Sequence, residues 1–439
     1  MNDERFVYRV ELTEENMRSV IRRARRYDGG GEHIGPQVRE IIQQVRQRGD
    51  RALADLTFRF EQARLQPEQL RVTPEEIKLA RKRVSAPVRA ALESMRKNLL
   101  AVETKRLVAL RGKIASPSGA TIRADYRPLA SVGCYVSGGR AIYPSSLVMS
   151  VTAAMAAGVP RVIICSPPST DGSIHPLILA AADLCGVSAI YKVGGAQAIA
   201  AMAYGTESIQ RVDKIVGPGN AFVTEAKLYV SRRVLIDSPA GPSELLVLAD
   251  ASANAKFIAL DLISQAEHGA ESVCGLVTPS KKLADAVDGQ LMDILERTPR
   301  KEVAGRCLRE RGFIAVCGKI DEAITFTNRF APEHLEIMAK QSDKIVPKIT
   351  SAGLILLGDY SPVAASDYFV GTNHVLPTGG HARLYSGLSS FDFVKRINVV
   401  ECTKQNLKKF IKPLQELAVA EGLPNHFLAI ARRVDAKNL

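Results

Sequence analysis

The stretch RVIICSPPSTDGSIHPLILAAADLCGVSAIYKVGG, residues 161–195, decides the fold class. It opens with a β-branched run, continues into the alanine- and leucine-rich run HPLILAAADLC, and ends in a second run, SAIYKV. Short apolar runs bounded by turn residues are typical of buried strands, and the longer run between them is typical of a helix. The stretch therefore predicts a β-α-β unit, whose right-handed crossover makes its two strands parallel.

The same alternation continues on both sides of this stretch. Strand-like and helix-like runs alternate from 130 to 244, and a second series begins at ELLVLAD and continues to 388. We therefore predict an α/β protein with two Rossmann-like parallel-sheet domains and helical N- and C-terminal extensions. The predicted parts are an N-terminal helical extension (1–33), a first α/β domain (34–129 plus 245–388), a second α/β domain (130–244) and a C-terminal helical tail (389–439).

The composition is typical of a globular protein without membrane segments. The chain has 439 residues, 46% of them hydrophobic, which suffices for more than one core. Its first ten residues carry charges where a signal peptide needs an apolar core, and the longest apolar run, 147–159, is interrupted by Ser and Thr. We therefore expect a cytoplasmic protein that does not enter a membrane.

The cysteines limit the kind of metal site that is expected, and the distribution of charge limits the kind of partner. The seven cysteines are scattered and never spaced as CxxC, so any metal would be bound by nitrogen and oxygen atoms. The net charge of +13 comes mostly from helix-like segments in 51–113 and 395–439, with few aromatic residues among the basic ones. This pattern indicates solvated helix faces, and we expect no nucleic-acid partner. A protein that binds an acidic partner through these faces is the alternative.

Three glycine-containing loops follow predicted strands and precede predicted helices. They are VSGGR (136–140), VGGAQ (193–197) and VGPGN (216–220). Free backbone N–H groups at the start of a helix suit phosphates, and three such loops in one block favour a nucleotide. Glycine also simply permits a turn, and the GxGxxG fingerprint is missing.

Gln265 and His268 stand three residues apart in a predicted helix, so both side chains lie on one face, whereas Glu267 points away. An amide oxygen and an imidazole nitrogen can bind zinc when further donors converge on them. Asp367, in a predicted loop after a strand, and His426, five residues after Glu421 in a predicted helix-turn-helix, are candidates for those donors. Capping or burial in a core are the ordinary roles for each of these residues taken alone.

The stretch APEHLEI places Glu333 and His334 in a turn that leads into an apolar strand. In a turn, both side chains can line one cleft. A carboxylate beside an imidazole suits acid–base chemistry near neutral pH. A solvated charged turn is the alternative.

Several motifs together resemble the histidinol dehydrogenase family, in the same order and over nearly the whole chain. They are VGCYVSGGR, VGGAQAIAAMAYGT, KIVGPGNAFVTEAK, IDSPAGPSELLVLAD, DLISQAEHG, NRFAPEHLEI, SDYFVGTNHVLPT, SGLSSFDFVKRI and EGLPNHFLAIARR. The resemblance implies an NAD-dependent enzyme with one zinc ion per active site. Such an enzyme oxidises L-histidinol to L-histidine through L-histidinaldehyde, the last step of histidine biosynthesis.

The resemblance also implies a role for individual residues. The zinc ligands are Gln265, His268, Asp367 and His426, which also contact the substrate; Glu333 and His334 form the acid–base pair; Ser243, His334 and Glu421 contact the substrate; and Tyr135, Gln197 and Asn220 contact NAD. It implies an intertwined homodimer with shared active sites, so that Glu421 and His426 complete the partner's site. A related zinc- and NAD-dependent dehydrogenase of another small alcohol is the alternative.

Overall fold

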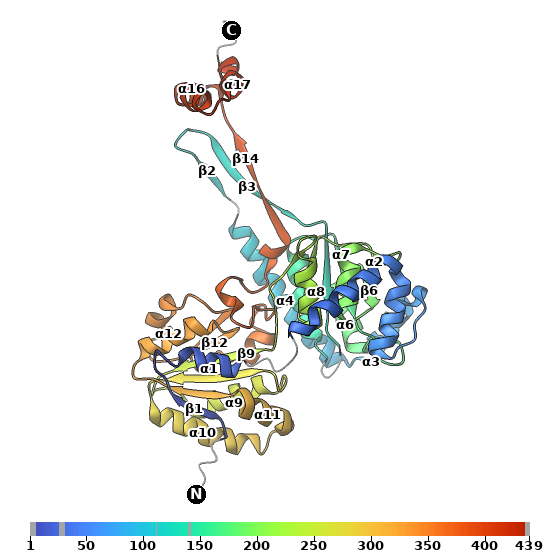
Figure 1. The fold of residues 1–439 in the computed structure, drawn as a ribbon, viewed down its shortest axis with the longest axis vertical. Helices are drawn as coiled ribbons and strands as arrows, with labels where there is room; N and C mark the ends of the chain where they lie inside the picture. The colour runs from blue at the N-terminus through green and yellow to red at the C-terminus, as the bar shows by residue number, and fades with distance from the viewer. Residues whose placement is uncertain (1–5, 26–30, 111, 139–141, 435–439) are drawn as a thin grey trace.

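Two parallel sheets organise two lobes of the molecule, and a narrow arm projects away from them (Figure 1). The computed structural model describes residues 6–25, 31–110, 112–138 and 142–434. The predicted fold class, α/β with parallel sheets, is confirmed.

The five-stranded lobe contains the stretch that decides the fold class. Its strands are all parallel, in the order β6-β5-β4-β7-β8. They are β4 (Ser131–Tyr135), β5 (Arg161–Ser166), β6 (Ala189–Lys192), β7 (Lys214–Val216) and β8 (Leu235–Ile236). The connecting helices are α5 (Pro144–Ala156), α6 (Pro176–Cys185), α7 (Gly195–Tyr204) and α8 (Ala221–Val230). The predicted β-α-β unit is β5-α6-β6, and the strand order reverses between β4 and β7, where doubly wound sheets open a crevice for ligands.

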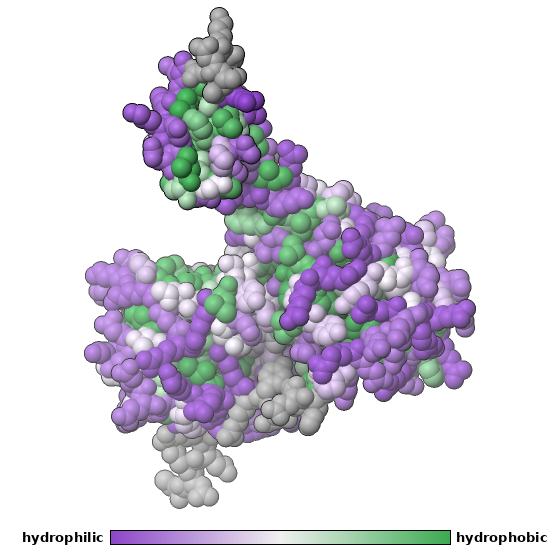
Figure 2. All heavy atoms as spheres, turned by 45° about the horizontal axis from the view of Figure 1, so that its top comes forward, coloured by the Kyte–Doolittle hydropathy of each residue, from purple (hydrophilic) through white to green (hydrophobic). Residues whose placement is uncertain are grey.

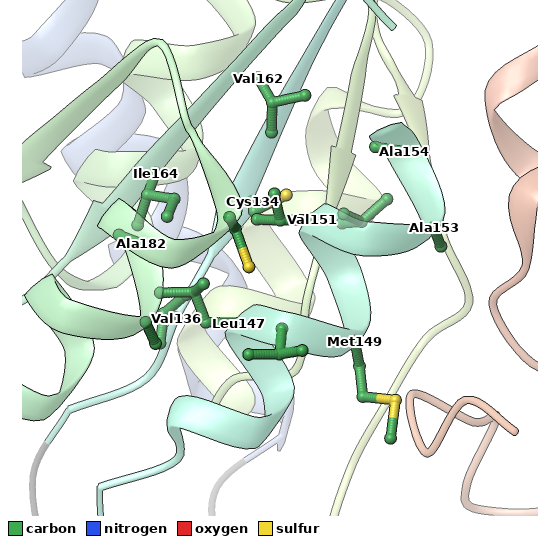
Figure 3. Packing of buried hydrophobic residues seen from close by; sticks show 14 of the residues in the cluster. Cys134, Val136, Leu147, Met149, Val151, Ala153, Ala154, Val162, Ile164 and Ala182 are labelled. Atoms are coloured by element: carbon green, nitrogen blue, oxygen red, sulfur yellow. The ribbon is translucent and has the colours of Figure 1, made fainter. Parts of the chain in front are cut away.

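Three further helices cover this five-stranded sheet. They are α2 (Gly31–Glu61), α3 (Pro74–Arg83) and α4 (Ala86–Ala109), with the 3-10 turn η1 (Pro67–Gln69) between α2 and α3. α2 packs on α7 and α8, while α3 and α4 pack on α6 and α5 across the sheet. Figure 3 shows part of the core on the α5 side, where Leu147 and Val151 lie beside Val136 and Cys134.

The expected grouping of residues 34–129 with 245–388 is therefore wrong. The apolar residues of these helices are buried against α5, α6, α7 and α8, because that is where the five-stranded sheet would otherwise expose its apolar faces.

The six-stranded lobe has its parallel strands in the order β1-β11-β10-β9-β12-β13. They are β1 (Tyr8–Glu11), β9 (Glu244–Ala249), β10 (Val273–Thr278), β11 (Phe313–Val316), β12 (His334–Met338) and β13 (Leu354–Leu357). Alternate residues of β9 belong to different cores, so both faces of the sheet are covered. One face carries α9 (Ala255–Ala266), α10 (Lys281–Leu295) and α11 (Lys301–Arg311), and the other carries α1 (Met17–Ala24) and α12 (Ile320–Phe330). Short elements follow: α13 (Ser342–Ile345), η2 (Val346–Lys348), α14 (Val363–Tyr368) and η3 (His381–Arg383).

The N-terminal segment belongs to the six-stranded lobe. β1 pairs with β11 at the sheet edge, and α1 packs on α12 through Met17, Val20 and Ala24. The expectation of a helical extension over 1–33 is therefore wrong for the described part, because the apolar alternation of β1 lets it add to an open edge. Residues 1–5 and 26–30 of that segment lie outside the described residues.

The arm combines two segments that are far apart in sequence. β2 (Lys113–Ala115), β3 (Thr121–Pro128) and β14 (Val394–Glu401) form an antiparallel sheet in the order β14-β3-β2. Helices α15 (Lys404–Lys408), α16 (Ile411–Ala420) and α17 (Pro424–Val434) form its tip (Figure 1). The predicted helical tail 389–439 therefore begins with the turn η4 (Ser390–Phe393) and a strand, and only its last part is helical; 435–439 lie outside the described residues. None of the helices in the described part of the chain is both long and apolar enough to cross a bilayer.

Candidate active site

A cavity of about 760 Å³ lies between the two lobes, and both lobes line it. Seven of the side chains expected at a site lie along its wall. They are Asn220, Ser243, Gln265, His268, Glu333, His334 and Asp367. The cavity therefore gathers residues from a span of almost 150 positions into one place.

The two sheets face this cavity with opposite ends of their strands. The five-stranded lobe contributes loops at the carboxyl ends of β4 and β7, including Ser137 and 218–221. The six-stranded lobe contributes residues at the amino ends of β9 and β12, namely Ser243 and Glu333–His334. The usual location of ligands at carboxyl ends therefore holds for one sheet only.

Glu333 and His334 lie where α12 gives way to β12. α12 ends at Phe330, the next residue, Ala331, is in the left-handed conformation (φ 51°), and β12 begins at His334, between β9 and β13. The predicted turn before a strand holds for Glu333 only, because His334 is already the first residue of β12. Glu333 and His334 are only 6% and 4% exposed, so a solvated charged turn is excluded.

Glu244, the first residue of β9, holds both members of this pair through its backbone. Its N–H donates to Glu333 Oε2 at 2.7 Å, and its carbonyl oxygen lies 3.3 Å from His334 Nδ1. The other ring nitrogen of His334, Nε2, lies 3.9 Å from Asp367 Oδ1 and has no hydrogen-bond partner among the described residues. One side of the imidazole is thus anchored, while the other faces Asp367.

Carboxylates dominate the electrostatics around His334. Burial opposes protonation of its ring, but the charges of Glu333 and Asp367 outweigh burial and raise the pKa of His334 to about 9. His374 lies 3.6 Å from the same Asp367 carboxylate, yet burial and the neighbouring His334 hold its pKa below the ordinary value. The pKa values of the two histidines are therefore shifted in opposite directions although both rings lie beside one carboxylate.

Gln265, His268 and Asp367 reach the cavity from helix ends. Gln265 lies in the last turn of α9, whereas His268 lies beyond the helix, in a turn in which its N–H donates to the carbonyl of Gln265. The expectation that one helix presents both is wrong, because α9 ends at Ala266; the turn nevertheless brings both to the cavity. The ring of His268 stacks on Tyr143 with the centroids 6.3 Å apart.

Asp367 lies in the short helix α14, where a loop was expected. The first turn of α14 is fixed by the N–H of Val363, which donates to Glu336 Oε1 at 2.9 Å. Asp367 follows Val363 by four residues, about one helical turn, and this places its carboxylate close to His334 and His374.

Glu421 and His426 do not line the cavity. Glu421 lies in the turn between α16 and α17 and His426 in α17, and both are exposed at the tip of the arm. The predicted helix-turn-helix is confirmed. Across the described residues, no three His, Cys, Asp or Glu side chains gather closely enough to hold a metal ion.

The residues expected to contact NAD lie at the carboxyl edge of the five-stranded sheet. The side chain of Asn220 caps α8 by accepting the N–H of Val223. Tyr135 ends β4, and its hydroxyl accepts the N–H of Gly195 at 3.1 Å. Gln197, next to this loop, is 1% exposed, and neither of its amide atoms has a hydrogen-bond partner among the described residues. Tyr135 and Gln197 therefore flank the loop before α7, outside the lining of the 760 Å³ cavity.

Glycine has a specific role in one of the three predicted loops. Gly217 has φ 115°, and a Cβ added there would lie 2.1 Å from the carbonyl oxygen of Tyr135. Only glycine lets the loop after β7 close on the end of β4 in this way. The loop 216–220 precedes α8 as predicted. α7 already begins at Gly195, so that only 193–194 of the loop 193–197 precede it, and Gly139 and Arg140 of the third loop lie outside the described residues.

A family model described as histidinol dehydrogenase matches residues 25–434. The chain belongs to the histidinol dehydrogenase family. It is therefore an oxidoreductase, and the resemblance that its motifs indicated is confirmed.

Individual members of the family resemble the whole chain. Histidinol dehydrogenase of Methanocaldococcus jannaschii is 42% identical over 97% of both chains, and that of Methanothermobacter thermautotrophicus is 44% identical over 91% of this chain and 93% of its own. The crystal structure of histidinol dehydrogenase from Elizabethkingia anophelis superposes with a TM-score of 0.93, at 35% identity and over 99% of both chains. The fold of the lobes and arm is thus that of the family.

Sequence reasoning missed His374, Glu244 and Arg25. His374 stands in the quoted motif SDYFVGTNHVLPT, but its ring also lies 3.1 Å from Ser146 Oγ, a residue of the other lobe. Arg25 forms an ion pair with Glu244 across 219 residues. A second histidine close to Asp367 was a usable signal for His374, whereas the partners of Arg25 depend on tertiary packing alone.

Proposed function

We propose that the protein oxidises L-histidinol to L-histidine through L-histidinaldehyde, in two successive NAD-dependent hydride transfers, as the last step of histidine biosynthesis. The observation that supports this proposal is the buried Glu333–His334 pair in the same cavity as Gln265, His268 and Asp367. Family membership supplies the reaction class, and this cavity supplies residues able to perform it.

The donor set fits a zinc ion. Gln265, His268 and Asp367 offer amide oxygen, imidazole nitrogen and carboxylate oxygen, the atom types that zinc accepts in the absence of thiolates. Zinc, when bound, would hold histidinol through its imidazole and amine nitrogens. We assign these three residues and the partner subunit's His426 as the ligands of one zinc ion per site, which also places them against the substrate.

The carboxyl edge of the five-stranded sheet fits NAD. The amide of Gln197 is buried and lacks partners among the described residues, and the N-termini of α7 and α8 offer backbone N–H groups for a pyrophosphate. NAD, when bound, accepts the hydride. We assign Tyr135, Gln197 and Asn220 to its binding.

His334 is the base for the alcohol proton in this proposal. A hydrogen donated from Nδ1 to the carbonyl of Glu244 leaves the lone pair on Nε2, the nitrogen without a partner among the described residues. The Asp367 carboxylate is one cause of the raised pKa of His334. Neutralising that carboxylate with a bound cation would therefore lower the pKa of His334, so that its ring would be free to accept the alcohol proton nearer neutral pH.

Glu333 is the group that activates water for attack on the aldehyde. One of its oxygens is fixed by the N–H of Glu244, which leaves the second for a water molecule. Ser243, at the cavity wall, and the partner's Glu421 would orient the substrate. Holding the reacting atoms in place in this way contributes up to roughly 10 kcal/mol in favourable cases.

An intertwined homodimer would bring the arm to the cavity. The arm extends away from its own lobes (Figure 1), and His426 is exposed at its tip. Figure 2 shows hydrophobic side chains gathered on this part of the surface, where Leu417 and Val419 are 62% and 65% exposed. Apolar patches of this kind mark interaction surfaces. We propose that the partner's arm completes each site and that this surface is buried in the dimer.

The test is turnover of L-histidinol with NAD, followed by NADH absorbance with and without a chelator. We expect two NADH per histidinol and L-histidine as product, with loss of activity after metal removal. One NADH per substrate, or turnover only of other small alcohols in a parallel panel, would contradict the proposal and favour a related dehydrogenase.

A cytoplasmic location of the protein stays a prediction.

A further inference from the structure

Arg25, the residue that follows α1, reaches the start of β9 in the interior of the six-stranded lobe. Its Nε and Nη2 donate to Oε1 and Oε2 of Glu244, each at 2.7 Å. The side chain of Glu244 is 2% exposed and that of Arg25 16%. This is a bidentate ion pair in a nearly dry setting, where planar guanidinium and carboxylate groups match in geometry.

Glu244 connects this ion pair to the acid–base residues. The same residue that accepts from Arg25 through its side chain holds Glu333 through its N–H and His334 through its carbonyl. A rotation of the first residue of β9 would therefore move both proton-handling groups at once. The N–H of Gly379 also donates to Glu244 Oε1, at 3.1 Å.

Arg25 contacts the acid–base segment from a second direction. Its guanidinium lies 4.1 Å from the centroid of the Phe330 ring and donates to the carbonyl of Ala331 at 3.5 Å. Ala331 has the left-handed backbone (φ 51°), which is costly for a residue with a side chain. The residue that bends the chain toward Glu333 is thus held by the same guanidinium that holds Glu244.

An unpaired carboxylate at this depth would not keep its position. Burial raises the pKa of Glu244, and the charge of Arg25 opposes that rise. Without the guanidinium, Glu244 would take up a proton or turn toward water, and either change disturbs the start of β9. Lysine would restore the charge but only one of the two parallel hydrogen bonds.

We propose that Arg25 is a positioning residue for the Glu333–His334 pair, which it fixes through Glu244 on one side and through Phe330–Ala331 on the other. The inference rests on the proposed function. It makes the N-terminal segment, β1 and α1 through Arg25, part of the catalytic apparatus.

The test compares Arg25→Met, Arg25→Lys and the control Arg23→Met in the full-length enzyme. Arg23 lies in the last turn of α1, two residues before Arg25, and its guanidinium stacks on Tyr8, 4.2 Å from the ring centroid, without contacting Glu244. We expect Arg25→Met to lower kcat by about 10- to 100-fold with KM for histidinol and NAD changed little. Arg25→Lys should recover part of this loss, and Arg23→Met should keep the wild-type kcat.

A readout independent of turnover accompanies the kinetics. In protein labelled with 15N-histidine, the ring signals of His334, assigned with a His334→Asn variant, should move in Arg25→Met and stay in place in Arg23→Met. Wild-type kcat in Arg25→Met, or unmoved His334 signals, would overturn the inference. If Arg25→Met does not fold, Arg25→Lys decides, because full activity with lysine would show that the bidentate geometry is not needed. Failure of the wild type to oxidise histidinol would instead overturn the proposed function, and the His334 signals would still report on Arg25.

Discussion

Glu333 and His334 are adjacent in sequence, yet their surroundings differ in a way that fits the two tasks proposed for them. The carboxylate of Glu333 is fixed by a single backbone N–H, so it keeps one oxygen for another hydrogen bond. The imidazole of His334 is held at Nδ1, and its Nε2 faces Asp367. A group that activates water and a group that removes an alcohol proton need these two different arrangements.

This difference predicts unequal effects on the two half-reactions when Glu333 is changed to Gln. Oxidation of histidinaldehyde should slow by about 10²- to 10⁴-fold, because water is no longer activated. Oxidation of histidinol should slow much less, because His334 retains its anchor on Glu244. Stopped-flow measurement of NADH formation from each substrate checks this, and equal slowing of both steps would count against the role of Glu333.

Changing His268 to Asn tests the metal assignment at the residue scale. We expect zinc content to fall strongly and activity to fall more than about 100-fold, while NAD affinity stays near the wild-type value, since His268 lies at the six-stranded lobe. Elemental analysis and a fluorescence titration with NAD measure the two quantities. Glu267→Gln is the matched control, because this neighbour does not line the cavity. A His268 variant that retains full zinc would refute the ligand role.

At the scale of elements, Glu336 connects the strand and the two helices that carry site residues: β12, α14 and α9. It lies on β12 two residues after His334, accepts the N–H that starts α14, and faces Asp261 of α9, one turn before Gln265. Burial and the charge of Asp261 raise the pKa of Glu336 to about 8. The Glu336–Asp261 pair therefore holds a proton near neutral pH. Because this proton removes one of the two negative charges, the two carboxyl groups can be buried side by side.

The raised pKa predicts how stability depends on pH. Between about 4.5, the ordinary value, and about 8, the folded state binds a proton at Glu336 that the unfolded state has lost. The free energy of unfolding should therefore fall as the pH rises through this window, by up to about 1.4 kcal/mol per pH unit for this group. In Glu336→Gln the fall should be shallower. Urea denaturation at several pH values checks this with Glu93→Gln, on an exposed face of α4, as control; parallel pH profiles for wild type and Glu336→Gln would contradict it.

Sequence patterns predicted where helices and strands lie along the chain better than they predicted which elements pack against each other. Apart from the two-residue β8, the strands from β4 to β13 follow local apolar runs, so the predicted series agrees with the structure there. The amphipathic pattern of α2, α3 and α4 shows that each buries one face but does not say against which sheet, and their assignment to residues 245–388 was wrong. α14 is only six residues long, too short for a periodic pattern, so Asp367 was expected in a loop.

For the whole molecule, the arm is the feature that a single chain does not explain. Its antiparallel strands come from residues before β4 and after β13, and its helices end far from the cavity that the other site residues line (Figure 1). The family resemblance was the source for placing Glu421 and His426 in a site. No local pattern could have suggested the proposed contribution of these residues to another subunit, because exposure and reach are properties of the folded arm.

Shared sites predict that two inactive variants restore activity to each other. When a His426→Asn chain and a Glu333→Gln chain are unfolded together and reassembled, a mixed dimer contains one site with an intact Glu333 and the partner's intact His426. Random pairing makes half of the dimers mixed, with one good site of two, so activity should return to about a quarter of the wild-type value. The matched control mixes His268→Asn with Glu333→Gln: both residues line the cavity of the same chain, so every site of that mixed dimer stays defective. Recovery in the first mixture and none in the second supports arm exchange. Absence of recovery in the first, with mixed dimers verified by mass spectrometry, would mean that His426 serves its own chain, and the arm would then have to fold back from the position seen here.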